Sequence, residues 1–187
     1  MLKLFESARC VSVPIVAIRT ADQAATVEAI RAVSSEYPLV QWDAARGVTE
    51  ANKLGAEALK KTGIVSAETI GFVEAMVAVQ LLPARTIVFA HNAHRQLHSS
   101  EPAGAAAAVQ AVANLRDRLK LNYRMLVLLA PEFTAPPELE HDVVILDHAL
   151  PGPDELGTIV TELYGSAKLK PPAAEVLAKA VDATSGL

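Results

Sequence analysis

The feature that most constrains the fold is an apolar run of β-branched and aromatic residues, Thr86–Ala90, which stops abruptly at His91 and Asn92. Such a run is typical of a strand buried on both faces of a parallel sheet. The carboxyl ends of parallel strands border the ligand crevice, so His91 and Asn92 occupy a candidate binding position. Nucleotide-hydrolysing sheets carry an acidic residue there to hold magnesium. The histidine therefore argues against that chemistry.

Four further apolar runs have a similar character, and helical patterns separate most of them. They lie at 13–18, 39–43, 124–130 and 143–147. Strands that alternate with helices predict an α/β fold with a parallel sheet of about five strands. Trp42, at the end of the second run, is interpreted as a core residue.

Between the second and third runs we expect a turn at 44–47 and an exposed helix at 51–61. A further helix is expected to begin near Ser66 and to end at Pro83. Its apolar residues recur on one face, namely Ile70, Val73, Val77 and Leu81.

Two helical patterns, at 154–164 and 173–181, come after the last strand. Helices in this place need a packing site separate from the alternating core. The domain prediction is an α/β domain at 1–150 and a helical extension at 151–187.

Composition excludes several functional classes. The 187 residues carry a formal net charge of −4 and no basic run, which argues against a nucleic-acid groove. Cys10 is the single cysteine, so no internal disulfide can form. We see neither a signal peptide nor a run long enough to span a membrane. The expectation is a soluble cytoplasmic protein.

The turn after the first strand lacks the residues that bind nucleotide phosphates. A phosphate-binding P-loop needs glycines for close backbone approach and a lysine for the β- and γ-phosphates. The stretch from Arg19 to Thr26 contains no glycine and no lysine. Thr20 or Asp22 can cap the following helix, and Asp22 would repel phosphate at that helix terminus. If any nucleotide site persists, Thr20, Asp22, His91 and Asn92 are its degenerate positions.

Three histidines follow the central strand at a spacing that would place them on one face of a helix. His91, His94 and His98 could bind zinc and leave a fourth position open. The alternative is a polar loop with partly solvated histidines, and we favour it because Glu101 is the one further ligand close in sequence.

The charged triplet Arg116–Arg118 is also open to two interpretations. It could reach a neighbouring subunit, or it could form intrahelical pairs on a solvated helix face. The second interpretation is favoured, because exposed ion pairs of this kind are common and weak.

Segments spread over most of the chain resemble the core of an AAA+ ATPase. They are 14–20 as first strand and turn, 40–42 with Gly47, 87–91 in place of the Walker B strand, 114–119 on the next helix, and 128–133 continuing through 137–140 to 150–151. The chain resembles in particular the degenerate, P-loop-less AAA-like domain at the N-terminus of AAA proteins from cyanobacteria and plastids.

The resemblance implies a three-layer, P-loop-NTPase-like sheet. It also implies that the region 151–187 is the start of a lid and that the chain is part of a longer protein. In that protein, ATP and magnesium would be bound by a second domain, which would drive assembly into a homo-oligomeric, hexameric ring.

Three functions remain open at this point. The first is a catalytically silent module without a cofactor that docks neighbouring subunits or a protein partner, with neither nucleic acid nor membrane involved. The second is a domain that binds ATP weakly through a nonstandard loop. The third is a small metal-dependent enzyme that uses the histidines at 91, 94 and 98.

Overall fold

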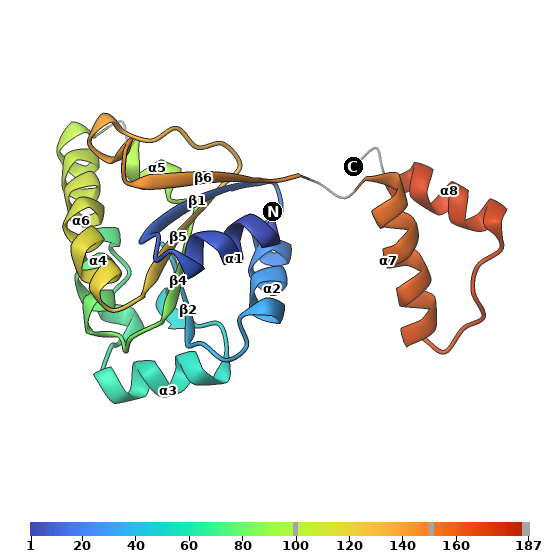
Figure 1. Ribbon diagram of the computed structural model, residues 1–187, viewed down its shortest axis with the longest axis horizontal. Coiled ribbons are helices and arrows are strands. Elements are labelled where there is room, and N and C mark those ends of the chain that lie inside the picture. Colours follow the sequence, from blue (N-terminus) through green and yellow to red (C-terminus); the bar gives the residue numbers. More distant parts are fainter. Residues whose placement is uncertain (99–100, 150–151, 185–187) are drawn as a thin grey trace. The chain divides into compact units, whose positions relative to one another are not determined.

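The computed structural model describes residues 1–98, 101–149 and 152–184 (Figure 1). The chain divides into two compact units, Met1–His148 and Ala149–Leu187. Residues 150 and 151, where the sequence places the domain boundary, lie outside the described ranges.

The first unit contains helices α1 (Leu2–Cys10), α2 (Gln23–Val33), α3 (Lys53–Thr62), α4 (Phe72–Ala78), α5 (His94–Leu97) and α6 (Pro102–Leu121). Its strands are β1 (Ile15–Thr20), β2 (Leu39–Asp43), β3 (Gly47–Glu50), β4 (Ile87–His91), β5 (Met125–Ala130) and β6 (Val143–His148). Three short 3-10 turns complete it, namely η1 (Ser66–Glu68), η2 (Val79–Leu81) and η3 (Pro137–Leu139).

The strands form one sheet in the order β3-β2-β4-β5-β1-β6. Every pairing is parallel except that of β3 with β2. Ile15 of β1 lies opposite Leu126 on one side and Val143 on the other. This register aligns the carboxyl ends of the central strands, and it confirms the predicted parallel α/β fold.

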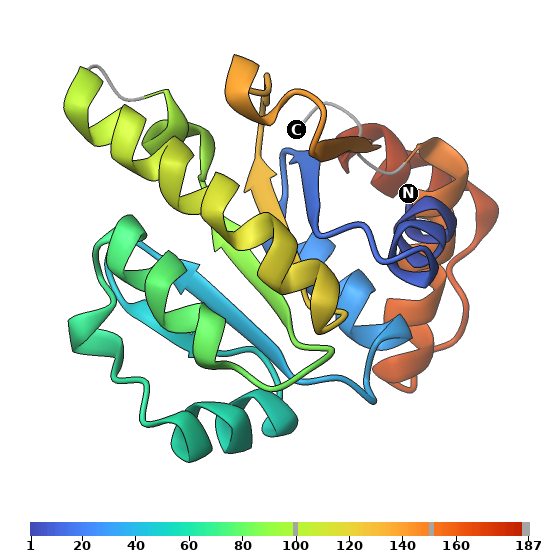
Figure 2. The same ribbon diagram turned by 60° about the vertical axis from the view of Figure 1, so that its left-hand side comes forward.

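Side-chain alternation along the strands builds a core on each face of the sheet. Ile15 and Ala17 belong to the core that includes buried residues of α4 and α6. Val16 and Ile18 belong to the second core, with buried residues of α1 and α2. Figure 2 shows α4 and α6 side by side, in agreement with the contacts between them. The result is the three-layer arrangement that the sequence predicted.

The turn expected at 44–47 is the tip of a hairpin whose second strand, β3, was not predicted. Asp43 accepts hydrogen bonds from the amides of Ala45 and Arg46, each at 2.9 Å, and Gly47 adopts a positive φ of 70°. The short strand that follows carries too little alternation to be recognised. The sheet therefore has six strands in place of about five.

The helix expected from Ser66 to Pro83 is divided, and the expected face was the wrong choice for the core. A 3-10 turn comes first, and α4 begins only after Gly71. The core receives Phe72, Ala75 and Met76. Three of the four residues singled out in the sequence are exposed instead, namely Ile70, Val77 and Leu81.

The second unit is a pair of helices, α7 (Pro153–Ser166) and α8 (Ala174–Thr184), at the two positions where the sequence predicted helices. The described part of α8 buries no residue. Ile159, Leu163 and Val176 remain exposed. Across the described ranges, every helix falls short of the length and apolarity that crossing a bilayer would require.

Candidate functional site

Parallel strands bring the candidate residues to one edge of the sheet. Thr20 ends β1, His91 ends β4 and His148 ends β6, and Thr20 lies directly opposite His148 in the strand register. Ligands of open α/β sheets bind at this carboxyl edge. We therefore take it as the candidate functional site.

The connection from β1 to α2 is too short to form a phosphate loop. It consists of Ala21 and Asp22, whereas the glycine-rich phosphate-binding motif occupies about eight residues. Asp22 is the N-cap of α2, and its Oδ1 accepts the amide of Ala25 at 2.9 Å. The helix terminus that binds phosphate in nucleotide-binding folds thus holds a carboxylate of the chain itself.

Beneath this cap lies a small network of hydroxyl groups. The hydroxyl of Thr26 is buried, 2.8 Å from Oγ1 of Thr20 and 2.7 Å from Nδ1 of His148. It also lies 2.7 Å from the carbonyl oxygen of Asp22. These bonds tie the ends of β1 and β6 to the first turns of α2.

A second network joins the ends of β4 and β2 to α2. Gln23 donates from Nε2 to Oδ1 of Asn92 at 2.9 Å. Its Oε1 lies 3.0 Å from Nδ1 of His91 and 3.3 Å from the backbone nitrogen of Asn92, which donates to it. Nε2 of His91 lies 3.1 Å from Oε1 of Gln41. Both ring nitrogens of His91 are therefore engaged by side chains of the same domain.

The protonation of His91 follows from these contacts. Burial lowers the pKa of His91 below 6.5, against an opposing effect of Asp43, so the ring is neutral near pH 7. Asn92 holds the Gln23 oxygen toward Nδ1, which places the single ring proton there. A neutral ring carries one proton, so it donates to only one of the two amide oxygens that face it, Oε1 of Gln23 and Oε1 of Gln41.

Of the other two histidines of the proposed zinc site, His94 begins α5 and His98 follows its last residue. Nε2 of His98 is 2.8 Å from the carbonyl oxygen of Thr134. Nδ1 of His94 is buried and finds no hydrogen-bond partner among the residues that the structure describes. Burial lowers the pKa of His94, aided by Arg95 and His98. Among the described residues, no three or more His, Cys, Asp or Glu side chains are grouped closely enough to hold a metal ion.

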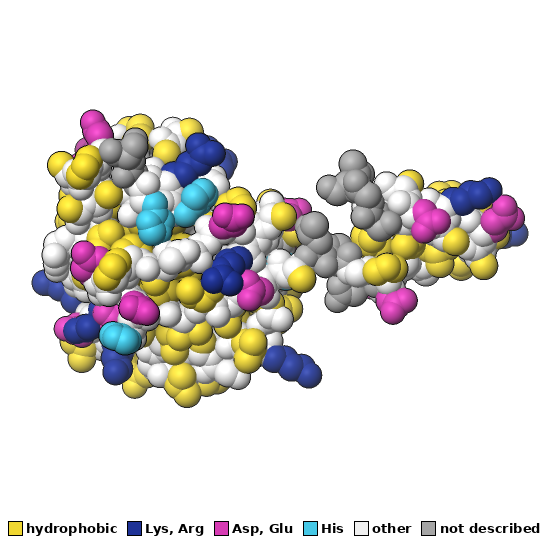
Figure 3. All heavy atoms as spheres, turned by 90° about the horizontal axis from the view of Figure 1, so that it is seen from above, with side chains coloured by type: hydrophobic (Ala, Val, Ile, Leu, Met, Phe, Trp, Pro, Cys, Tyr) yellow, Lys and Arg dark blue, Asp and Glu magenta, His cyan; other side chains and the backbone are white. Residues whose placement is uncertain are grey.

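Cations beside the candidate site already have partners. Arg19 donates from Nε to the carbonyl oxygen of Phe133 at 3.1 Å and pairs with Asp147 at 3.3 Å. Arg46 pairs with Asp43 at 2.7 Å. On the face shown in Figure 3, cationic and anionic side chains of the first unit are interspersed with hydrophobic ones.

Four residues of the networks were missed at the level of sequence, namely Gln23, Thr26, Gln41 and His148. Gln23 and Thr26 lie in the first turns of the helix that follows β1, where any side chain can reach the carboxyl edge. That position is a usable signal. Gln41 and His148 required the strand register, because only the sheet order brings β2 beside β4 and β6 beside β1.

Comparison with known proteins relates the first unit to a family and to solved folds. Residues 2–148 match the model of the family described as SpoVK-like AAA ATPase, N-terminal domain. Among solved structures, a DNA replication initiation factor is similar with a TM-score of 0.55 and 13% identity, over 96% of this chain and 54% of that chain. A chain of the Escherichia coli MS115-1 HORMA:CdnC:Trip13 complex gives a TM-score of 0.52 and 13% identity, over 90% and 58%.

At these identities the structural likeness concerns the fold alone. The chain spans little more than half the length of the two similar structures. No curated protein matches its sequence.

Proposed function

Because this chain belongs to the SpoVK-like AAA ATPase N-terminal domain family, we propose that it is a catalytically silent AAA+-like module of a longer AAA ATPase. Its role is assembly with neighbouring subunits or docking of a protein partner. The observation that carries the proposal is the Asp22 carboxylate, which accepts the Ala25 amide at the terminus of α2.

Phosphate binding at this terminus would require several changes at once. A phosphate group would have to displace the Asp22 carboxylate from the helix amides while being repelled by its charge. The two-residue connection leaves no loop to surround a triphosphate. His91 replaces the acid that would hold magnesium, and both of its ring nitrogens are engaged.

The structural similarity to a chain of a multi-protein complex supports the docking role. One similar structure is a chain of the HORMA:CdnC:Trip13 complex. In the present chain, side chains hydrogen-bonded to one another occupy the described part of the carboxyl edge, which favours surfaces and loops as the means of function. In the parent protein we expect a homo-oligomer whose nucleotide is bound by another domain.

Calorimetric titration of the purified chain with ATP and magnesium tests the silent character. We expect no saturable heat, and the Asp22→Ala variant should behave alike because the connection stays too short. Saturable binding near micromolar affinity would contradict the proposal and favour a weak, nonstandard ATP site. Stoichiometric zinc that survives chelator dialysis and is lost in His94→Ala would favour the metal-dependent alternative.

A further inference from the structure

Helix α4 is apolar on two faces, and the first unit covers only one of them. Its inner face packs into the core through Phe72 and Met76. Val77 on the helix and Leu81 just beyond it are 59% and 65% exposed. Apolar side chains exposed together on one helix face are typical of a contact surface, so the outer face indicates a contact that the first unit alone does not make.

A hollow of about 460 Å³ lies between this outer face and the end of α3. We call it the α4 groove, and it is lined by Ile64, Val65, Val77 and Leu81, with Glu68 and Glu74 among its polar residues. These two glutamates are its only charged lining residues among those described, and neither is in an ion pair within the described ranges. The groove is therefore apolar with acidic groups.

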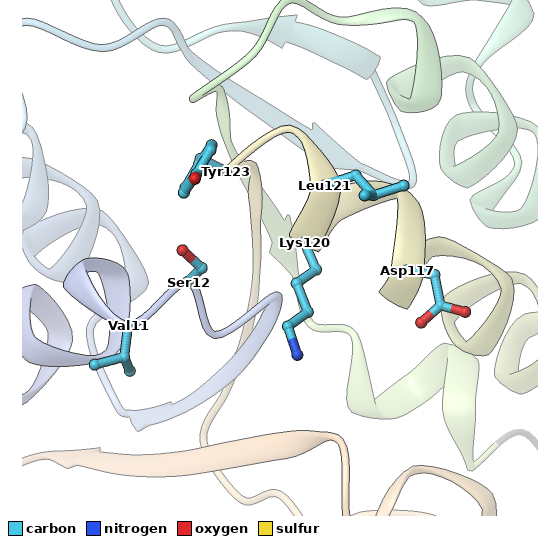
Figure 4. Close-up of a pocket in the computed structure, with 6 residues that line it drawn as sticks. All are labelled: Val11, Ser12, Asp117, Lys120, Leu121 and Tyr123. Atoms are coloured by element: carbon cyan, nitrogen blue, oxygen red, sulfur yellow. The ribbon is translucent and has the colours of Figure 1, made fainter.

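A second hollow, of about 600 Å³, lies at the amino end of the sheet. We call it the Tyr123 surface, and it is lined by Val11, Ser12, Asp117, Lys120, Leu121 and Tyr123. Figure 4 shows that these residues come from the connection between α1 and β1 and from the end of α6 with the turn beyond it. Val11, Leu121 and Tyr123 are 72%, 78% and 63% exposed.

The charges of the Tyr123 surface complement those of the α4 groove. Asp117 is already paired with Arg116 at 3.1 Å. Lys120 has no ion pair within the part of the chain that the structure describes. Its ammonium group is thus the available charge beside the apolar side chains, opposite in sign to Glu68 and Glu74.

Tyr123 occupies a backbone conformation that favours glycine over an aromatic residue. Tyr123 has a φ of 53°, in the left-handed conformation that follows α6, and the amide of Arg124 bonds back to the carbonyl of Leu119 at 2.9 Å. Glycine is the preferred residue at such a helix end, and a bulky residue is strained there. A largely exposed aromatic ring at a position that favours glycine points to an external contact, since aromatic residues are enriched at interfaces.

We propose that the Tyr123 surface of one copy docks into the α4 groove of a second copy. The inference rests on the proposed function, because it names the surfaces through which an assembly module would join its neighbours. Two unlike, complementary surfaces on one chain produce a head-to-tail contact, which closes into a ring or continues as a filament. Aliphatic and aromatic side chains fill the groove, and Lys120 meets its carboxylates.

The test uses analytical ultracentrifugation of the full 187-residue chain over a range of concentrations. Wild type is expected to associate as concentration rises. Val77→Asp in the groove and Tyr123→Gly on the opposing surface should each raise the dissociation constant by at least about tenfold, as loss of a central contact does. Leu169→Asp, an exposed apolar residue of the second unit, is the matched control and should associate like wild type.

Mixing the two defective variants distinguishes a head-to-tail contact from a symmetric one. Val77→Asp retains a working Tyr123 surface, and Tyr123→Gly retains a working groove, so their mixture should form a one-to-one pair and nothing larger. Lys120→Glu should weaken association, and Glu68→Lys with Glu74→Lys on the other copy should restore it. Circular dichroism verifies that each variant is folded.

Three results would overturn the inference. They are a wild type that stays monomeric at every concentration, a folded Val77→Asp variant that associates like wild type, and a mixture that stays monomeric although wild type associates. A monomeric wild type would leave the silent-module proposal standing, because that proposal depends on the titration with ATP. Saturable ATP binding would remove the proposed function without changing the association result.

Discussion

The carboxyl edge of the sheet and the outer surfaces of the first unit differ in how fully their groups are satisfied. At the edge, Asp22, Gln23 and Thr26 meet partners within the domain at hydrogen-bond distance. At the surfaces, Val77 and Tyr123 have their apolar groups in water. Side chains of the domain itself engage the positions that serve ligand binding in related folds, whereas the exposed apolar groups lie on other surfaces. The difference supports the proposed docking role.

The largest effect is expected from opening the hydroxyl network. Thr26→Val keeps the side-chain volume but leaves Nδ1 of His148 without its partner. Removing one member of a buried hydrogen-bonded set costs roughly 1–3 kcal/mol, and urea denaturation should show a loss of that size. Ser7→Ala is the control, since this exposed hydroxyl bonds only the Lys3 carbonyl and its loss should matter by less than ~0.5 kcal/mol. Equal losses would mean that the edge is no better satisfied than the surface.

The N-cap of α2 comes next in expected size. Asp22→Ala removes the acceptor of the Ala25 amide and should lower the free energy of unfolding by about 1 kcal/mol. Asp22→Asn keeps an oxygen in the same place and should recover most of that stability. If both variants were as stable as wild type, the carboxylate would not be stabilising the helix terminus that we describe as occupied.

Tyr123→Gly should change stability in the opposite direction. Glycine relieves the left-handed backbone, so the free energy of unfolding is expected to stay level or to rise by up to ~1 kcal/mol. Tyr123→Ala keeps the unfavourable backbone and should show no gain. A loss above ~1 kcal/mol in the glycine variant would show that the ring stabilises its own domain, which would remove the contrast between the two regions.

The smallest effect is expected from pH. Burial lowers the pKa values of His91 and His94 below 6.5 in the folded chain, so the unfolded chain binds more protons just below that pH. The free energy of unfolding should therefore fall as the pH drops below 6.5 and stay level above it, apart from other groups. Urea denaturation at several pH values from about 5 to about 8, the range in which histidine titrates, measures this slope. A slope that His91→Gln leaves unchanged would exclude His91 as a source.

Much of the fold could be read from the sequence because buried strands leave continuous apolar runs. Thr86–Ala90 predicted the central strand, and the stretch from Arg19 to Thr26 lacks the glycines and the lysine of a phosphate loop. The orientation of α4 could not be read in this way. Its sequence is apolar on both faces, so periodicity detects the helix without indicating which face the core takes.

The sequence placed candidate residues at the carboxyl ends of strands, but it did not predict which side chains they contact. The spacing of His91, His94 and His98 suggested a shared face, yet His91 ends a strand, His94 begins a separate short helix and His98 follows that helix. The partners of His91 are Gln23 and Gln41, which come from other elements. Such contacts depend on the order of strands in the sheet, and that order is not written in the local sequence.

The most direct test of the comparison is an amide nitrogen-15 NMR spectrum of the chain, recorded at low and high protein concentration and then with ATP and magnesium. We predict that raising the concentration shifts amides of the α4 groove and the Tyr123 surface. ATP is predicted to leave the amides of Gln23 and Ala25 in place. Shifts of these two amides with ATP, together with concentration-independent signals at Val77 and Tyr123, would contradict the account.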